Sequence, residues 1–313
     1  MTKNVTCFIF SLQALDLEAL VTQLVASSGE TESFDSGLEV RAIHTIASED
    51  LAFYRSAAAL SLNIPTNTPD SDIKVTVEHL SQIVKFDYCL LSSPEQVTAI
   101  KLAVFDMDST LIPMEVIDEL AAEAGVKEEV AAITEQAMQG DLDFNQSFKK
   151  RLSLLRGMSK QAVGEVKSRL TFNAGVEQLI AHLVDHGAVV GIASGGFEPF
   201  AKALAELAPI TKIRSNTLLF DSDELAGQAV EPIVNAEVKA HQVKEWQAEL
   251  GIGSNEIMVV GDGANDSKMM EVAGLGVAYK AKPLLRQKAD CVIQYGEMNG
   301  LIDILKVVLR FRA

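Results

Sequence analysis

Apolar runs that stop abruptly at polar residues dominate the chain from residue 100 onward. The first run, Ile100–Phe105, ends at Asp106, which is the pattern of a parallel strand buried on both faces. Similar runs are Ala188–Ala193, Ile257–Val260, Leu275–Ala278 and Cys291–Gln294. Helical periodicity lies between and after them, at Gly175–His186, Phe197–Leu207, Ala236–Leu250, Asn265–Ala273 and Pro283–Ala289. This alternation predicts an α/β fold with a doubly wound parallel sheet, whose ligands bind at the carboxyl ends of the strands.

A helical insertion interrupts the alternation between the first two of these strands. Glycine-containing breaks divide it into four segments with helical patterns: Glu115–Ala124, Lys127–Met138, Phe144–Leu155 and Lys160–Leu170. Asp143 is a plausible N-cap for the third segment. Four short helices inserted here predict a cap, at about residues 113–172, that covers the crevice and controls access of water to it.

The first 95 residues have a different pattern. Alternating apolar segments at Val5–Phe10 and Leu38–Ile46 separate helical patterns at Leu15–Ala26 and Glu49–Leu62. Proline, asparagine and aspartate are frequent in Asn63–Asp72, which suggests a connecting stretch. We therefore expect a small N-terminal α+β domain over residues 1–95, followed by the α/β domain with its cap over residues 96–313.

Composition and charge narrow the classes of function. The chain has 313 residues, of which 48% are hydrophobic, and this is ample for a folded core. It carries 27 basic and 43 acidic residues, for a net charge of −16. So acidic a chain is not expected to bind nucleic acid or an anionic membrane surface. An anionic substrate would need a few local cations or a metal.

Cysteine usage and hydropathy bear on location. Cys7, Cys89 and Cys291 are far apart and odd in number, which is neither a disulfide framework nor a zinc pattern. No apolar run approaches the ~20 residues that span a bilayer, and Val5–Phe10 is too short for a signal peptide. We expect a soluble, cytoplasmic protein with reduced thiols.

Polar residues at two strand ends carry the strongest chemical signals. Asp106 and Asp108 follow the first strand directly, and two like charges so close favour a bound cation or a shared proton. The alternative is a turn that aspartate caps. Gly261-Asp262-Gly263-Ala264-Asn265-Asp266 follows Ile257–Val260 and brings three polar side chains beside two glycines. A dinucleotide fingerprint would need a third glycine where Asp266 stands, so the alternative is a glycine-rich turn.

Two weaker signals suit an anion. Ser194-Gly195-Gly196 precedes a predicted helix, where a hydroxyl and free backbone amides form an anion seat; a simple strand-to-helix turn is the alternative. Lys239 lies near the start of another predicted helix, where a surface lysine is the alternative.

Taken together, the four signals point to phosphoryl chemistry. Asp106, Asp108 and Asp262 offer hard oxygen ligands of the kind that Mg²⁺ prefers, and Ser194 and Lys239 suit phosphate oxygens. The chain lacks a Gly-x4-Gly-Lys-Ser/Thr loop, which excludes a P-loop nucleotide enzyme. An aspartate nucleophile that attacks phosphorus, with a second carboxylate that moves protons, fits these residues.

The series Asp-x-Asp-x-Thr, Ser-Gly-Gly, lysine and Gly-Asp-Gly-x-Asn-Asp resembles the haloacid-dehalogenase superfamily of phosphotransferases. Within the cap, the resemblance is to its phosphoserine phosphatases. It rests on Met114-Glu115, Ala137-Met138-Gln139-Gly140, Leu142-Asp143-Phe144 and Lys150-Arg151-Leu152-Ser153-Leu154-Leu155. It runs from about Leu102 to the C-terminus and implies a Rossmann-like core with a helical cap.

The resemblance implies a role for each residue of the site. Asp106 would be the nucleophile that becomes an aspartyl-phosphate, and Asp108 would move protons. Mg²⁺ would be held by Asp106, the backbone carbonyl of Asp108 and Asp262, with Asp266 in support. The phosphate would be bound by Ser194, Gly195 and Lys239, and Asn265 would lie near the substrate. Glu115 would bind the ammonium group of the substrate, and Arg151 would bind its carboxylate.

The expected activity is hydrolysis of O-phospho-L-serine to serine and phosphate, the last step of serine biosynthesis. Another small phosphomonoester, or phosphoryl transfer to an acceptor, is the alternative. Without the resemblance, Glu115 is a first-turn helix acid and Arg151 a solvated helix residue. The first 90 residues loosely resemble ACT-like regulatory domains, which implies a homodimer or serine sensing.

Overall fold

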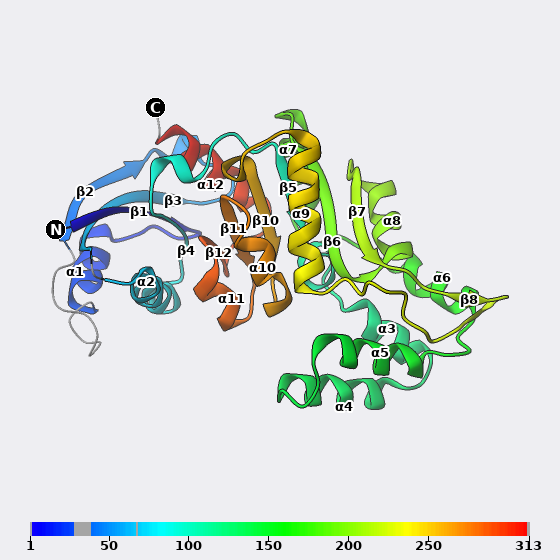
Figure 1. Cartoon of the computed structure of the whole chain (residues 1–313). Helices are drawn as coiled ribbons and strands as arrows, with labels where there is room; N and C mark the ends of the chain where they lie inside the picture. Colours follow the sequence, from blue (N-terminus) through cyan, green and yellow to red (C-terminus); the bar gives the residue numbers. More distant parts are fainter. Residues whose placement is uncertain (1, 28–38, 67, 312–313) are drawn as a thin grey trace.

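The computed structural model describes residues 2–27, 39–66 and 68–311, and a ten-stranded sheet runs through all three segments (Figure 1). Its strands are β1 (Thr2–Ser11), β2 (Glu39–Ile46), β3 (Ser56–Pro65), β4 (Asp87–Leu91), β5 (Leu102–Phe105), β6 (Val189–Phe197), β7 (Lys212–Asn216), β10 (Ile257–Gly261), β11 (Leu275–Tyr279) and β12 (Cys291–Ile293). They lie in the order β2-β3-β1-β4-β12-β11-β10-β5-β6-β7.

The six strands from β12 to β7 are all parallel to one another, which confirms the predicted α/β fold. Each of the five predicted apolar runs forms one of these strands. β5 lies between β10 and β6, and its four residues are buried because both of its faces are covered. The residue that follows β5 is therefore at the middle of the carboxyl edge of the parallel part of the sheet.

The N-terminal strands extend the same sheet instead of forming a separate one. β4 pairs antiparallel with β12, so that Cys89 faces Cys291 and Tyr88 faces Val292. The predicted helix over Glu49–Leu62 is wrong, because a short turn at Ser48–Asp50 leads into β3. Three consecutive alanines favour a helix, but here their small side chains pack in a strand between β1 and β2. The strand predicted from Leu38 is β2, and Leu38 itself lies outside the described residues.

Two buried carboxylates tie the N-terminal strands to the rest of the chain. Asp87 accepts hydrogen bonds from the hydroxyl of Tyr54 (2.7 Å) and from the backbone N–H groups of residues 294–296. In the opposite direction, Asp303 accepts from the backbone N–H groups of residues 52–54. Each carboxylate is nearly inaccessible to water, and its backbone N–H partners come from the other part of the chain.

Helices cover both faces of the sheet. The helices outside the cap are α1 (Leu17–Ser27), α2 (Asp70–Val84), α7 (Val176–Asp185), α8 (Glu198–Leu207), α9 (Ala236–Leu250), α10 (Ser267–Met270), α11 (Pro283–Lys288) and α12 (Gly300–Arg310). Ala103 and Phe105 of β5 pack in a core with α7, α8 and α12, whereas Leu102 and Val104 pack in a core with the other five. This alternation is the period of two that a strand imposes. The hydrophobic pattern of the sequence did not predict three of these elements, α2, β4 and α12.

Four helices between β5 and β6 form the cap: α3 (Val116–Glu123), α4 (Lys127–Met138), α5 (Phe144–Leu154) and α6 (Lys160–Ser168). All four were predicted, and Asp143 caps α5 by accepting from the N–H of Gln146 (2.8 Å). The short hairpin of β8 (Phe220–Asp221) and β9 (Glu224–Leu225) hydrogen-bonds to the cap.

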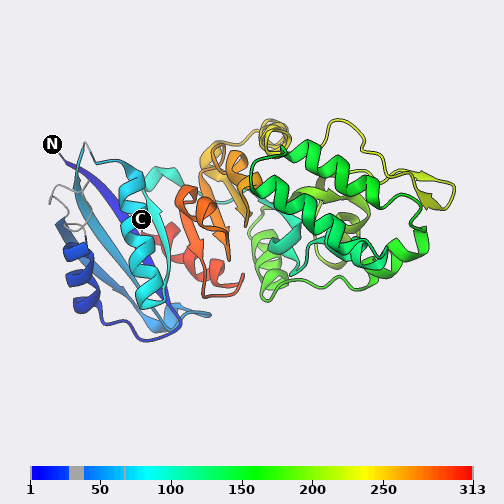
Figure 2. The ribbon, with the colours of Figure 1, turned by 90° about the horizontal axis from the view of Figure 1, so that it is seen from below.

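The cap and the N-terminal strands lie at opposite ends of the molecule (Figure 2). No helix among the described residues is long and apolar enough to cross a bilayer.

Candidate active site

Asp106 follows β5 and is the residue on which the site converges. Its backbone N–H donates to the carbonyl of Val260 at 2.9 Å, which continues the pairing with β10 by one residue. The residue is 4% exposed, and its side chain accepts from three donors. Oδ2 accepts from Nζ of Lys239 (2.8 Å) and Nδ2 of Asn265 (3.1 Å), and Oδ1 accepts from the N–H of Met107 (2.7 Å). These three contacts hold the carboxylate in one orientation.

Lys239 is completely buried and not the surface residue of the alternative interpretation. It lies in the first turn of α9, and its Nζ is 2.8 Å from Oδ2 of Asp106 and 2.8 Å from Oδ1 of Asp266. The two carboxylates raise the pKa of Lys239 despite the opposing effect of burial. A buried cation that bridges two acids keeps positive charge directly behind Asp106.

The loop after β10 is shaped by Asp266. Oδ2 of Asp266 accepts from the backbone N–H groups of Asp262 and Gly263, both at 3.1 Å. A Cβ atom at Gly261 would overlap that same carboxylate, so the first glycine of the motif leaves room for it. As a result, Asp262 lines the same cavity as Asp106, whereas Asp266 is completely buried beneath the loop.

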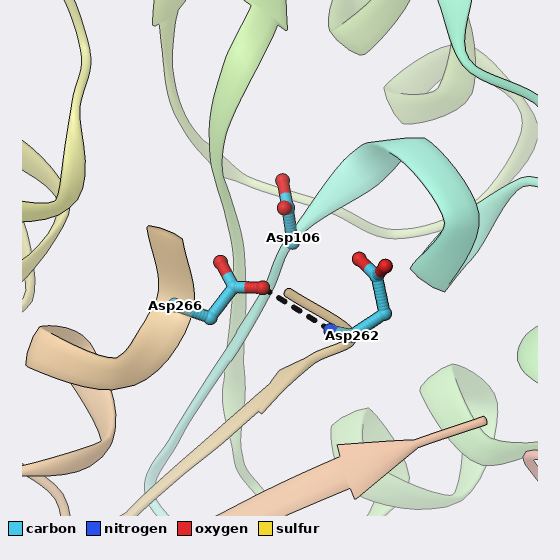
Figure 3. A group of neighbouring side chains, drawn as sticks. All are labelled: Asp106, Asp262 and Asp266. Carbon is cyan, nitrogen blue, oxygen red and sulfur yellow. Dashed lines mark hydrogen bonds between the residues drawn. The ribbon is translucent and has the colours of Figure 1, made fainter. Parts of the chain in front are cut away.

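Asp106, Asp262 and Asp266 form an acidic cluster (Figure 3), and each offers a carboxylate oxygen within 4.8 Å of the others. Burial and the charge of Asp106 raise the pKa of Asp262 to about 6 and that of Asp266 to about 8. Lys239 opposes both of these shifts. Such crowding of hard oxygen ligands fits a divalent cation. Both oxygens of Asp266 accept hydrogen bonds, and so do both oxygens of Asp106. Asp262 accepts a long hydrogen bond from the hydroxyl of Thr110 at 3.4 Å, so its carboxylate is the best placed of the three to bind a cation.

Asp108 is turned toward the cap and away from this cluster. The chain makes a wide turn over Met107–Leu111 with Ser109 at a φ of 56°, and Oδ1 of Asp108 accepts from the N–H of Val116 at 2.9 Å. Burial, followed by the charges of Glu115 and Asp106, raises the pKa of Asp108 well above its ordinary value. Asp108 is therefore suited to carry a proton.

The Ser-Gly-Gly segment differs in detail from the prediction. β6 continues through it to Phe197, so its amides are not at a helix terminus, and Oγ of Ser194 accepts from the N–H of Gly196 (2.9 Å). Ser194 is fully buried, whereas Gly195 and Gly196 line the cavity. A Cβ at Gly196 would overlap Oδ2 of Asp108, which explains the second glycine.

A cavity of about 340 Å³ joins these core residues to the cap. Both Glu115 and Arg151 line it, so neither is an ordinary solvated helix residue. Oε1 of Glu115 accepts from the hydroxyl of Ser109 (2.7 Å), and burial raises the pKa of Glu115. Burial lowers the pKa of Arg151, and its buried Nε has no hydrogen-bond partner among the described residues. An unpaired guanidinium donor beside a cavity indicates an anionic ligand group.

Lys282 belongs to the site although the sequence analysis did not select it. It follows β11, lines the cavity and also lines a wider groove of about 710 Å³ between cap and core. The rule that ligands meet the carboxyl ends of strands applies equally to β11 and could have found this residue. Most of the predicted site residues line the cavity, and the three that do not, Ser194, Lys239 and Asp266, are completely buried beneath it.

Comparisons with known proteins agree with this geometry. Residues 100–274 match the family model described as haloacid dehalogenase-like hydrolase. The chain is 41% identical over 238 residues to a probable phosphoserine phosphatase of Schizosaccharomyces pombe, which covers 75% of this chain and 80% of the relative.

Two solved structures extend the comparison. The structure of a HAD family hydrolase from Salmonella enterica serovar Typhi has a TM-score of 0.79 and 30% identity, with 96% of this chain and 99% of that chain covered. A phosphoserine phosphatase with an analogue of its phospho-aspartyl intermediate has a TM-score of 0.62 and 38% identity. That comparison covers 67% of this chain and 99% of the other.

Proposed function

The chain belongs to the haloacid dehalogenase-like hydrolase family, and we propose that it is a phosphatase that hydrolyses O-phospho-L-serine to L-serine and phosphate. The observation that carries the proposal is a cavity of about 340 Å³ that residues of both the core and the cap line. It joins the Asp106–Asp108 pair on the core to Glu115 and Arg151 on the cap. The volume is at the low end of the ~300–1,000 Å³ typical of small-molecule sites, as a substrate of this size requires.

Asp106 is the nucleophile in the first step. Its carboxylate attacks phosphorus, the bond from phosphorus to the serine oxygen breaks, and Asp108 gives its proton to that oxygen. The products are serine and an aspartyl-phosphate at Asp106. The high pKa of Asp108 supports its role as the acid, and the hydrogen bonds to Asp106 keep the attacking group oriented.

The second step regenerates the carboxylate. Asp108, now ionised, takes a proton from a water molecule whose oxygen attacks phosphorus. The bond from phosphorus to Asp106 breaks, and phosphate leaves. Ser194, Gly195 and Lys239 hold the phosphoryl oxygens in both steps, with Asn265 beside them. The lining of the cavity by Gly195 and Asn265 supports this assignment, and the contact of Lys239 Nζ with Asp106 Oδ2 at 2.8 Å puts its charge next to the carboxylate that receives the phosphoryl group.

The acidic cluster fits Mg²⁺, with Asp106, the backbone carbonyl of Asp108 and Asp262 as its ligands. When bound, Mg²⁺ would offset the negative charge of the phosphoryl oxygens that approach Asp106. Asp266 keeps the loop of Asp262 in place through its two backbone hydrogen bonds.

The cap residues give the site its preference for an amino acid. Glu115 binds the ammonium group of the substrate, and Arg151 binds its carboxylate. The guanidinium fork suits a carboxylate, and the unpaired Nε of Arg151 supports this role.

We also propose that residues 1–95 mediate a homodimer, with residues 96–313 as the phosphatase domain and 113–172 as its cap. β2 supports the dimer, because it pairs with β3 and lies at the outer edge of the described sheet. The three cysteines are free and buried, which agrees with a reducing, cytoplasmic location.

The test is phosphate release with Mg²⁺ from O-phospho-L-serine, phosphothreonine and p-nitrophenyl phosphate, by the unchanged chain and by Arg151→Lys. We expect phosphoserine to be hydrolysed fastest, and EDTA to stop the reaction. Arg151→Lys should raise KM for phosphoserine about tenfold and leave p-nitrophenyl phosphate unaffected, since that ester has no carboxylate.

Equal rates on all three esters would contradict the proposed substrate while leaving the phosphoryl chemistry intact. In that case another small phosphomonoester, or transfer to an alcohol acceptor, becomes the better assignment.

A further inference from the structure

Lys282 has a position that the chemistry at Asp106 does not explain. Its backbone N–H donates to the carbonyl oxygen of Asp262 at 2.9 Å, so its side chain begins beside the acidic cluster. Lys282 lines both the inner cavity and the wider groove that shares a wall with it. A substrate that moves from the groove to Asp106 therefore passes this residue.

The structure of α11 does not call for a lysine at this point. Lys282 is the residue before the first helical residue, Pro283, where the helix dipole disfavours a cation. Among the described residues no carboxylate lies within ion-pair distance (4.0 Å) of Lys282, although several other exposed lysines, such as Lys288, have such a partner. Neither helix capping nor a surface ion pair accounts for Lys282.

The charges around the cavity give Lys282 a function. The lining contains five carboxyl groups and two basic side chains, Arg151 on the cap and Lys282 on the core. Lys239 is buried, and its charge is shared between two carboxylates. The charge of Lys282 opposes part of the rise in pKa that burial causes at Glu115 and Asp262, so it acts on carboxyl groups of both the cap side and the core side of the cavity.

We propose that Lys282 captures the anionic substrate at the mouth of the cavity. Its Nζ attracts the phosphoryl group on its way from the groove to Asp106, against the field of a chain with a net charge of −16. This role rests on the proposed function and adds a specificity-determining residue to it. Lys282 acts on binding, and bond making and breaking remain with Asp106 and Asp108.

The test compares Lys282→Met with Lys288→Met, which removes the same charge from the other end of α11. Both side chains are exposed, and the backbone hydrogen bond to Asp262 is retained in either variant. Steady-state kinetics with phosphoserine and saturating Mg²⁺ are measured from about 20 to 300 mM NaCl, a range over which screening becomes strong. Lys282→Gln is a second variant in case the methionine impairs folding, and Lys282→Arg restores the charge.

We expect Lys282→Met and Lys282→Gln to lower kcat/KM about 5- to 20-fold at low salt through KM, with kcat changed less than about twofold. The deficit should shrink at high salt, and Lys288→Met and Lys282→Arg should resemble the unchanged chain. The proposal is overturned if the Lys282 variants match Lys288→Met. It is also overturned if kcat falls while KM is unchanged, since Lys282 would then act in the chemical steps.

Inorganic phosphate separates this proposal from the proposed function. If the unchanged chain fails to hydrolyse phosphoserine, the proposed function fails, and calorimetry of phosphate binding with Mg²⁺ still judges Lys282. Weaker binding by Lys282→Met than by Lys288→Met supports capture of the phosphoryl group, and equal binding refutes it.

Discussion

Replacement of Lys239 by methionine tests the buried charges at the centre of the site. Methionine has a similar length but no charge, so Asp106 and Asp266 would each lose a partner at 2.8 Å. Breaking a buried ion pair from one side typically costs about 3–5 kcal/mol in the free energy of unfolding. Asp106 retains donors from Met107 and Asn265, and Asp266 retains two backbone N–H groups. We therefore expect the lower end, about 3 kcal/mol at pH 8.

The loss should depend on pH with a definite sign. The pKa of Lys239 is raised in the folded protein, so its own stabilising effect is complete below the ordinary lysine value of 10.5 and constant from pH 5 to pH 8. In the variant, Asp266 loses the cation that opposes the effect of burial, so the pKa of Asp266 rises further. A carboxyl group whose pKa is raised in the folded protein destabilises that protein at pH values above the pKa of the group in the unfolded chain. This destabilisation decreases as the pH falls and the group becomes protonated in the folded protein. The deficit should consequently be smaller at pH 5 than at pH 8.

The assay is urea unfolding of both proteins in EDTA at pH 5 and pH 8. The double variant Lys239→Met/Asp266→Asn removes one of the two unpaired charges and should recover about half of the loss. A deficit below about 1 kcal/mol at pH 8, typical of a surface ion pair, would refute the reasoning. A deficit that is equal at the two pH values would also refute it.

Three further predictions concern other contacts. Gly196→Ala should displace Asp108 and lower kcat about 10- to 100-fold, whereas Gly164→Ala in α6, where a Cβ meets nothing within 4 Å, should not. Because the pKa of Asp262 is raised to about 6, protons should compete with Mg²⁺ for this carboxylate below pH 6. Calorimetry should therefore show weaker Mg²⁺ binding at pH 5 than at pH 7.5, and equal affinity at the two pH values would argue against Asp262 as a ligand. Asp87→Asn should reduce the free energy of unfolding by about 1–3 kcal/mol, measured in urea, with kcat unchanged; an unchanged stability would mean that Asp87 does not tie β4 to residues 294–296.

The fold was predictable where local pattern and burial agree. Five of the six strands in the parallel half contain an apolar run, because both faces of the sheet are covered there. The sixth, β7, is the edge strand and is largely polar. The helix predicted over Glu49–Leu62 is wrong because the helical propensity of Ala57–Ala59 is overridden by strand pairing. One partner strand, β1, is far away in the sequence, and the other, β2, is separated from the alanines by a loop. The join between β4 and β12 is likewise invisible locally, since its partners are about 200 residues apart.

The site was predictable because its residues sit at strand ends or in motifs with characteristic spacing. The carboxyl-edge rule selects Asp106 and Asp262, and the resemblance adds Glu115 and Arg151. The burial of Lys239 could not be predicted, because lysine is usually exposed and the two carboxylates that surround its Nζ come from distant parts of the sequence. Lys282 was missed because it is followed by an ordinary helix start and belongs to none of the motifs.

The central claim is that Asp106 carries the phosphoryl group between the two steps. The most direct measurement is rapid mixing with O-phospho-L-serine and Mg²⁺, an acid quench in the first turnover, and mass spectrometry of the peptide that contains Asp106. We predict one phosphoryl group on that peptide, located at Asp106, and neither a labelled peptide nor phosphate release with Asp106→Asn. Turnover by the unchanged chain without any phosphoryl group on this peptide, or continued turnover by Asp106→Asn, would contradict the account.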